Sequence, residues 1–281
     1  MKMDVKEILE ERKKFLEKKM EYFLSEQSST LGESVRYSVM SGGKRFRPLL
    51  LLSIGESLGA PLEELIYPAC AIEFIHTSTL IHDDLPALDN DDWRRGKPTN
   101  HKVFGEGVAL LAGDFLIALA FSILSFFPER KSAEQIKLRA ISILGEELKN
   151  LIKGQTFELL AKSPSEYEII YLYLLKTGSL MSASAELAGV FAQVDEESIS
   201  VLKNFGSNLG LAFQITDDLL DLFQDQRKNN SPFNYAYLYG HEIARTKAQY
   251  YRDKALEDLK KLGIKSPVVE YLVNLSTNRE I

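Results

Sequence analysis

Twelve residues in the second half of the chain place three acids in an otherwise apolar stretch with helical spacing: Gly210-Leu211-Ala212-Phe213-Gln214-Ile215-Thr216-Asp217-Asp218-Leu219-Leu220-Asp221. Asp217 and Asp221 are four residues apart, so in a helix their carboxylates share one face, one turn apart. Asp218 lies about 100° further round than Asp217. Unpaired carboxylates among apolar neighbours repel one another and carry a heavy burial cost. Because magnesium binds a few carboxylates together with substrate phosphate, this stretch predicts a helix that carries metal ligands.

A second acidic cluster lies earlier in the chain, directly after an apolar helical run. Five aspartates fall within ten residues, between Asp83 and Asp92. Taken alone, either cluster also fits a solvated acidic helix face. Neither has the alternating acids, central glycine and terminal glutamate of a calcium-binding EF-hand loop. Two such clusters in one helical chain favour metal binding over a solvated surface.

Apolar residues recur at three-, four- and seven-residue intervals along the chain, as in Leu144-Leu148-Leu151-Ile152, and long period-two alternation is missing. The fold class is therefore predicted to be all-α. Glycine and proline boundaries divide the chain into about ten helices, with one long polar loop from Pro86 to Gly105. No repeat or low-complexity linker interrupts it, so we expect a single domain over residues 1–281, built as one large helical bundle.

The composition excludes several classes of function. The 281 residues carry a net charge of −6, so binding to nucleic acid would need a localised basic patch. The N-terminus shows no hydrophobic signal core, and Cys70 in its apolar surroundings is expected to be a buried structural thiol. Both features favour a cytoplasmic protein. Val108–Phe127 is long enough to span a bilayer, but Asp114 interrupts it, so a buried helix of a soluble bundle is expected.

Two basic segments supply candidate partners for an anion. Ser41–Pro48 has two glycines followed by three cations in four positions, and Arg94-Arg95-Gly96-Lys97-Pro98 follows the first acidic cluster. Arginine is a planar fork suited to phosphate oxygens, so diphosphate binding is one interpretation and a solvated patch is the other. His76 precedes Asp83 by seven residues, two helical turns away on the same side. For His76, a core histidine and a ligand both stay open.

Together these motifs resemble the trans-polyprenyl diphosphate synthase family, the farnesyl and geranylgeranyl diphosphate synthases. The resemblance runs from about Leu31 to Gln224. It rests on five segments in order: Gly-Gly-Lys-Arg-Phe-Arg-Pro at 42–48, Asp-Asp-x-x-x-x-Asp at 83–89, Arg-Arg-Gly-Lys-Pro-Thr at 94–99, Lys-Thr-Gly at 176–178 and the acidic helix at 210–221. It implies an isoprenoid synthase bundle with a central cavity, a magnesium-dependent prenyltransferase activity and a homodimer.

The resemblance also implies roles for individual residues. Those that would hold isopentenyl diphosphate are Lys44, Arg47, His76 and Arg95. Several magnesium ions bridging the allylic diphosphate would be held by Asp83, Asp84, Asp89 and Asp217. The allylic site would be completed by Arg94, Lys176 and Gln214, with Thr177 helping Gln214 to orient charge. Asp218 and Asp221 would belong to the metal set by supporting metal-bound water and the neighbouring cations.

The implied reaction needs no side-chain nucleophile. Departure of the allylic diphosphate leaves a carbocation, the isopentenyl double bond attacks it, and a proton is then lost. The residues implied in catalysis are Asp83, Asp84, Lys176, Thr177, Gln214 and Asp217. The chain departs from the family at Glu158, where aspartate is usual, and in the compressed segment after Asp221, where Lys228 is the candidate for a lysine that reaches the allylic diphosphate.

Product length is expected to depend on side chains just before the first acidic motif. Ser78 and Thr79 are small where farnesyl-type bacterial enzymes usually have an aromatic residue, which favours geranylgeranyl diphosphate. Phe74, one turn earlier, is the alternative floor and would favour the farnesyl product. The rival functions are a class I terpene cyclase, which would lack the Gly-Gly-Lys-Arg-x-Arg-Pro segment, and a non-catalytic subunit of a heteromeric synthase, which would have lost one acidic motif.

Overall fold

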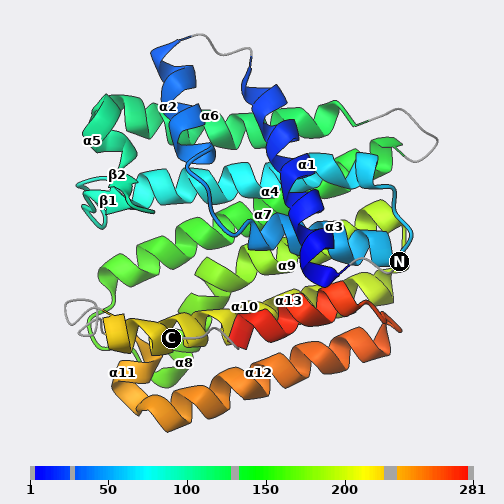
Figure 1. Ribbon diagram of the computed structural model, residues 1–281. Coiled ribbons are helices and arrows are strands. Elements are labelled where there is room, and N and C mark those ends of the chain that lie inside the picture. Colours follow the sequence, from blue (N-terminus) through cyan, green and yellow to red (C-terminus); the bar gives the residue numbers. More distant parts are fainter. Residues whose placement is uncertain (1–3, 26–28, 128–132, 225–232, 278–281) are drawn as a thin grey trace. The chain divides into compact units, whose positions relative to one another are not determined.

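The computed structural model describes residues 4–25, 29–127, 133–224 and 233–277 (Figure 1). The chain forms two compact units, Met1–Leu52 with Pro61–Ile141 and Ser53–Ala60 with Ser142–Ile281. In the described residues the secondary structure is helical apart from one pair of two-residue strands. The prediction of an all-α fold is therefore confirmed.

The first unit is built around a pair of long apolar helices, α4 and α6, that pack against each other. Its elements are α1 (Val5–Leu24), α2 (Thr30–Val39), most of α3 (Phe46–Ser57), α4 (Leu62–Asp83), β1 (Trp93–Arg94), β2 (Lys97–Pro98), α5 (Asn100–Phe104), α6 (Glu106–Ser125) and the start of α7 (Ala133–Leu160). Ser29 caps α2 by accepting a hydrogen bond from the Gly32 backbone N–H. Helix α4 buries thirteen of its residues, so its acidic end at Asp83 is set on a rigid element.

A short hairpin replaces part of the loop that the sequence predicted between Pro86 and Gly105. Strands β1 and β2 are antiparallel, with Arg94 paired with Lys97. Arg95 and Gly96 form the two-residue turn, with φ of 52° and 74°. Such a turn needs positive φ at both central residues. The sequence did not predict this hairpin because Arg-Gly lacks the Asn-Gly or Asp-Gly signature of such turns.

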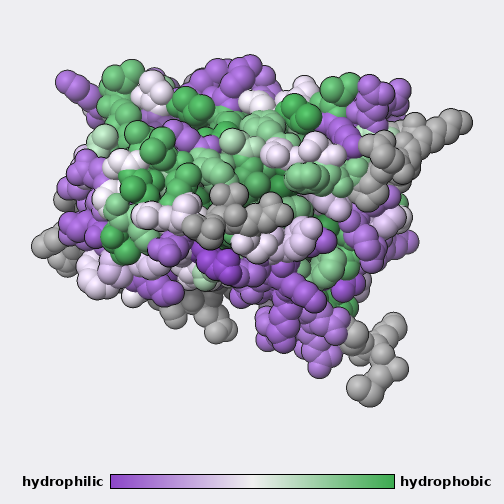
Figure 2. Space-filling model, turned by 90° about the horizontal axis from the view of Figure 1, so that it is seen from above, coloured by the Kyte–Doolittle hydropathy of each residue, from purple (hydrophilic) through white to green (hydrophobic). Residues whose placement is uncertain are grey.

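Helix α6 is only partly covered, which differs from the expected buried helix. By length and composition it could cross a membrane, with a mean hydropathy of 2.2, and 39% of that apolar window is buried. It packs on α2, α4 and α5, yet Leu110, Leu111 and Phe126 next to its end are 48%, 57% and 61% exposed. Figure 2 looks onto the side where α2 and α6 lie, and hydrophobic residues gather across it.

The second unit is organised around helix α10, which packs against α9, α12, α11 and α13. Its elements are the remainder of α7, α8 (Glu166–Tyr173), a π-helical turn η1 (Leu174–Gly178), α9 (Ser179–Ala192), α10 (Glu196–Gln224), α11 (Tyr235–Tyr239), α12 (His241–Lys261) and α13 (Pro267–Thr277). At Gly210 an added Cβ would lie 2.7 Å from the Cα of Gly178. Glycine at 210 therefore lets α10 approach the π-helical turn closely.

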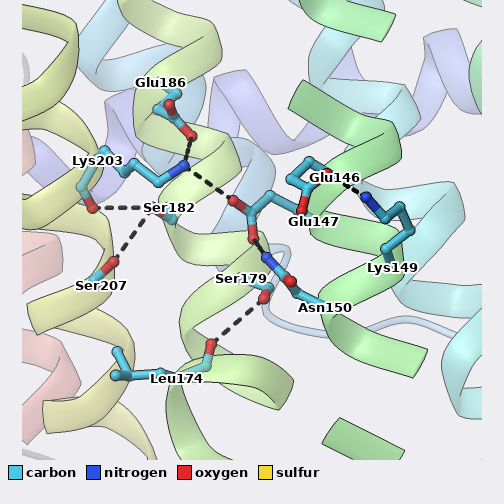
Figure 3. A network of polar contacts seen from close by, with 10 residues as sticks. All are labelled: Glu146, Glu147, Lys149, Asn150, Leu174, Ser179, Ser182, Glu186, Lys203 and Ser207. Carbon is cyan, nitrogen blue, oxygen red and sulfur yellow. Dashed lines mark hydrogen bonds and ion pairs between the residues drawn. The ribbon is translucent and has the colours of Figure 1, made fainter. Parts of the chain in front are cut away.

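A polar network joins three helices of this unit (Figure 3). The ammonium of Lys203 on α10 lies 3.3 Å from Glu147 on α7 and 3.3 Å from Glu186 on α9. Ser182 on α9 donates to the backbone carbonyl of Lys203 at 2.9 Å. The network fixes α10 relative to α7 and α9, and with it the acidic stretch that α10 carries.

Candidate active site

The first acidic motif forms a closed loop at the end of α4. The backbone N–H of Asp89 donates to the carbonyl of Asp83 at 2.8 Å, which brings these two residues together. Asp83 is half-buried and Asp89 is exposed. Their carboxylates are oxygen donors at the surface of the unit, which is the chemistry that magnesium prefers.

Asp84 has different surroundings from Asp83 and Asp89. It is 3% exposed, and the Nε of Arg94 on strand β1 lies 2.7 and 2.9 Å from its two carboxylate oxygens. Burial raises the pKa of Asp84, and the hydrogen bond and charge of Arg94 oppose that rise. For Arg94, burial would lower the pKa, but hydrogen bonding to Asp84 raises it above its ordinary value. This pair ties the hairpin to α4.

The two basic segments meet in the first unit. Arg95 donates from Nη1 to the carbonyl of Gly42. Gly43 has a φ of +128°, and an added Cβ there would lie 2.9 Å from the guanidinium carbon of Arg95. Glycine at 43 is therefore needed both for the backbone conformation and for the close approach of Arg95.

The three cations after the glycines have unequal roles. Arg45 is 2% exposed and lies 2.7 Å from Glu73, with further bonds to Glu17 and the Val39 carbonyl. It is a structural residue within a buried ion pair. Lys44 is exposed and Arg47 is half-buried, so these two remain the candidates for binding an anion.

His76 lies on α4 in a strongly cationic environment. Burial lowers its pKa well below the usual range, and the charges of Arg47, Arg95, Arg45 and Arg94 lower it further. The imidazole is therefore neutral near pH 7 and offers one N–H donor and one acceptor. A neutral donor close to several guanidinium groups suits the binding of a diphosphate.

The residues predicted to control product length all lie on α4. Phe74 and Ser78 are fully buried, and Thr79 is half-buried. The Ser78 hydroxyl donates to the Ile75 carbonyl and the Thr79 hydroxyl to the His76 carbonyl, both at 2.8 Å. Their polar atoms are satisfied within the helix, so each presents only a small side chain to its surroundings.

In the second unit, Lys176 and Thr177 lie in the π-helical turn η1. Turns of π-helix are rare in proteins, and those that occur often lie at functional sites. The hydroxyl of Thr177 donates to Oε1 of Gln214 on α10 at 2.6 Å. Lys176 pairs with Glu158, the glutamate at which the chain departs from the family pattern. The structure thus brings three predicted site residues, Lys176, Thr177 and Gln214, to one end of this unit.

The three acids of α10 are not equivalent. Asp217 and Asp221 are half-buried, whereas Asp218 is 5% exposed. Asp218 accepts hydrogen bonds from the Tyr235 backbone N–H at 2.7 Å, from Gln214 Nε2 at 3.2 Å and from the Tyr173 hydroxyl. Burial raises the pKa of Asp218 to about 7, against the effect of these three donors.

Sequence reasoning missed Tyr173 and Tyr235, which contact the site through Asp218. Neither stands in a recognised motif, and both reach Asp218 from segments far from it in the sequence. Lys228 lies outside the described residues. Cys70 is fully buried, and burial raises its thiol pKa, so the interpretation as a structural thiol is confirmed.

Within the described ranges, no group of three or more His, Cys, Asp or Glu residues forms a ready-made metal site. The donor set still fits magnesium, because both acidic motifs offer carboxylate oxygens on solvent-accessible residues and the basic residues would hold the phosphate that completes its coordination.

Comparisons with known proteins show which family the chain is similar to. The polyprenyl synthetase family model matches residues 28–235. Geranylgeranyl pyrophosphate synthase 12 of Arabidopsis thaliana is 38% identical, over 87% of this chain and 72% of the relative. Farnesyl diphosphate synthase of Geobacillus stearothermophilus is 34% identical over 99% of both chains. The crystal structure of a geranyltransferase from Legionella pneumophila superposes with a TM-score of 0.89 at 30% identity, covering 98% of each chain.

The fold is the all-α fold of the isoprenoid synthases. The chain belongs to the polyprenyl synthetase family. The family resemblance of the motifs is thereby confirmed, as is the class of enzyme, which transfers prenyl groups.

Proposed function

We propose that this protein condenses isopentenyl diphosphate with dimethylallyl, geranyl and farnesyl diphosphates to give geranylgeranyl diphosphate. The observation that carries the proposal is the convergence of Gly43, Arg95 and neutral His76 in the unit whose helix α4 ends in the acidic motif. That unit combines cations for one diphosphate with carboxylates for the metal ions of another. The similarity to synthases named for the twenty-carbon and fifteen-carbon products supports it.

We assign Lys44, Arg47, His76 and Arg95 to the isopentenyl diphosphate. Magnesium ions held by Asp83, Asp84 and Asp89, and a further magnesium held by Asp217, would supply the positive charge that stabilises the departing allylic diphosphate. Asp84 would have to exchange its Arg94 partner for the metal, which would leave Arg94 available to the diphosphate. Lys176 in the π-helical turn adds a cation, and Thr177 with Gln214 orients a polar pair beside it.

The test is a product assay. Purified protein receives isopentenyl diphosphate with each allylic diphosphate, with magnesium or with EDTA, and the chain length is read by mass spectrometry. A magnesium-dependent twenty-carbon product supports the proposal. A stop at fifteen carbons keeps the reaction and assigns the floor to Phe74. No condensation with any substrate would favour a non-catalytic subunit, and a cyclised hydrocarbon would favour a terpene cyclase.

The twenty-carbon product rests on the small side chains of Ser78 and Thr79. If they leave room for the growing chain, Ser78→Phe should shorten the main product to fifteen carbons while condensation continues. Ser57→Phe on α3 is a control for the general effect of a new aromatic residue, because Ser57 is distant in sequence from the acidic motif. An unchanged twenty-carbon product in Ser78→Phe would contradict the assignment.

We also propose that the protein is a homodimer in which a second copy covers the exposed apolar face of α6. The exposed side chains at Leu110, Leu111 and Phe126 favour a partner over solvent, and the family resemblance supports a second copy. Leu111→Glu should convert the dimer to a monomer in light scattering. Ile243→Glu on α12 is matched in exposure, 56% against 57%, and should leave the mass unchanged. A monomeric wild type would overturn this proposal.

Two further expectations belong to the same proposal. We expect both units to act as one synthase domain, since the family match at 28–235 runs through both. Limited proteolysis that separated two independently folded pieces with activity in one of them would contradict it.

We expect a cytoplasmic protein, in keeping with the buried reduced thiol of Cys70, and cell fractionation is the measurement.

A further inference from the structure

We propose that Asp218 is a positioning residue: with Tyr173 it fixes the amide of Gln214 so that its oxygen faces Thr177. This inference rests on the proposed prenyl transfer, in which Thr177 and Gln214 belong to the site. It gives Asp218 a role in hydrogen bonding that the family resemblance, which assigns it to the support of metal-bound water, does not imply.

Both carboxylate oxygens of Asp218 are occupied by donors of the protein itself. Oδ2 accepts from the Tyr235 backbone N–H at 2.7 Å and from the Tyr173 hydroxyl, while Oδ1 accepts from Gln214 Nε2 at 3.2 Å. The residue is 5% exposed. A metal ion would have to displace these bonds and enter a buried position, at the cost of leaving buried donors without acceptors. Asp217, one position earlier, is half-buried on a different side of α10.

Asp218 determines which way the Gln214 amide points. Gln214 Nε2 donates to Oδ1 of Asp218 at 3.2 Å, so the amide NH₂ faces Asp218. The amide oxygen is then left facing Thr177, whose hydroxyl donates to it at 2.6 Å. The hydroxyl proton of Thr177 is thereby committed, and its oxygen lone pairs remain to accept a hydrogen bond. Through Gln214, Asp218 therefore determines that the Thr177 hydroxyl donates within the protein and accepts from a bound ligand.

The same carboxylate anchors the chain that leads into α11. Tyr173 also lies within hydrogen-bond reach of the Phe233 carbonyl, and the Asn234 side chain donates to the Asp218 carbonyl at 3.4 Å. The Tyr235 N–H contacts both Asp218 and Tyr173. Helices α8, α10 and α11 thus meet at Asp218, which holds its side chain in one orientation.

The decisive experiment exchanges the donor and acceptor groups. In Asp218→Asn, the new NH₂ faces the NH₂ of Gln214, so the amide of Gln214 must reverse and present NH₂ to Thr177. In the double variant Asp218→Asn with Gln214→Glu, the amide introduced at position 218 would donate to the carboxylate introduced at position 214, which again accepts from Thr177. The total charge equals that of the wild type, and every hydrogen bond between these three side chains has a donor and an acceptor.

We expect Asp218→Asn to lower kcat by about 10- to 100-fold, the loss for one misdirected hydrogen bond at a reacting centre. The magnesium concentration for half-maximal rate should stay within about twofold of the wild type, and adding Gln214→Glu should restore kcat to within about fivefold. Asp217→Asn is the matched comparison and should raise the magnesium requirement. An equal rise in Asp218→Asn, or no recovery in the double variant, would overturn the inference.

Stability provides a readout that does not depend on activity. Each single variant, Asp218→Asn or Gln214→Glu, should unfold at a lower denaturant concentration than the double variant, because only the double restores complementarity. Additive effects would contradict the proposed contact.

If Asp218→Asn does not fold, the variant Tyr173→Phe provides the test. We expect a lower kcat with an unchanged magnesium requirement, and an unchanged kcat would overturn the role of Tyr173. Absence of condensation in the wild type would instead refute the proposed function.

Discussion

Replacing Lys203 with methionine tests whether the network between α7, α9 and α10 holds the second unit together (Figure 3). Lys203 Nζ lies 3.3 Å from Glu147 and 3.3 Å from Glu186, whose side chains are 4% and 10% exposed. Methionine keeps the length of the side chain and removes its charge. Two buried carboxylates would then lose their shared cation and lie near each other on neighbouring helices.

The contacts set the size of the effect. One ion pair at this separation is worth about 5 kcal/mol at an effective dielectric constant of about 20. Breaking a buried pair on one side costs about 3 to 5 kcal/mol. Since the Lys203 side chain is 49% exposed, solvent screens part of its interaction, so we expect a loss of about 2 to 3 kcal/mol in the free energy of unfolding. For a chain of 281 residues that corresponds to a Tm lower by about 3 to 5 °C.

The assay is chemical and thermal unfolding of Lys203→Met beside two controls. Lys203→Arg keeps the charge and should lose less than about 1 kcal/mol, since the contacts to both carboxylates can be made again. Lys254 is 46% exposed and pairs with exposed Glu257 at 3.7 Å, so Lys254→Met should cost less than about 0.5 kcal/mol. Equal stability of Lys203→Met and Lys254→Met would show that the network does not hold these helices together.

Three shorter predictions follow from other features. Gly210→Ala should lower the free energy of unfolding by about 1 to 3 kcal/mol, because the added Cβ would lie 2.7 Å from a backbone atom of the π-helical turn. The control Gly145→Ala, with open space around it, should raise the free energy of unfolding by up to about 1 kcal/mol, and urea unfolding measures both. Because the pKa of His76 is lowered in the folded protein, the unfolded chain binds the proton first, and the free energy of unfolding should fall as the pH drops below about 6.5, by at most about 1.4 kcal/mol per pH unit. His76→Gln should remove that part of the pH dependence of stability. An unchanged pH dependence in this variant would contradict the environment described for His76. The buried Cys70 thiol should react with a thiol reagent only after unfolding, and rapid reaction of the native protein would show that the thiol is accessible.

Much of the fold could be predicted from the sequence because helical spacing and breaker residues are local signals. The helix carrying Asp217 and Asp221 was predicted from an apolar stretch interrupted by acids, and α10 confirms it. The proline boundary at Ser163-Pro164 is one of those local signals, and it lies between α7 and α8. The hairpin at Arg95-Gly96 was not predicted, because a left-handed arginine is uncommon and its φ depends on the contact of that arginine with the Gly42-Gly43 turn.

The class of fold, the motifs and the chemistry they offer can all be read from the order of the amino acids, because each follows from the spacing and type of neighbouring residues. Which members of a motif act alike depends instead on long-range contacts. Arg45 and Arg47 are two positions apart, yet the first is a buried partner of Glu73 and the second is half-buried. Asp217 and Asp218 are adjacent, yet Tyr173 and Tyr235, from distant segments, enclose the second. Burial and hydrogen-bond partners come from residues far apart in the chain, and these set whether a charged side chain binds a ligand or supports the protein.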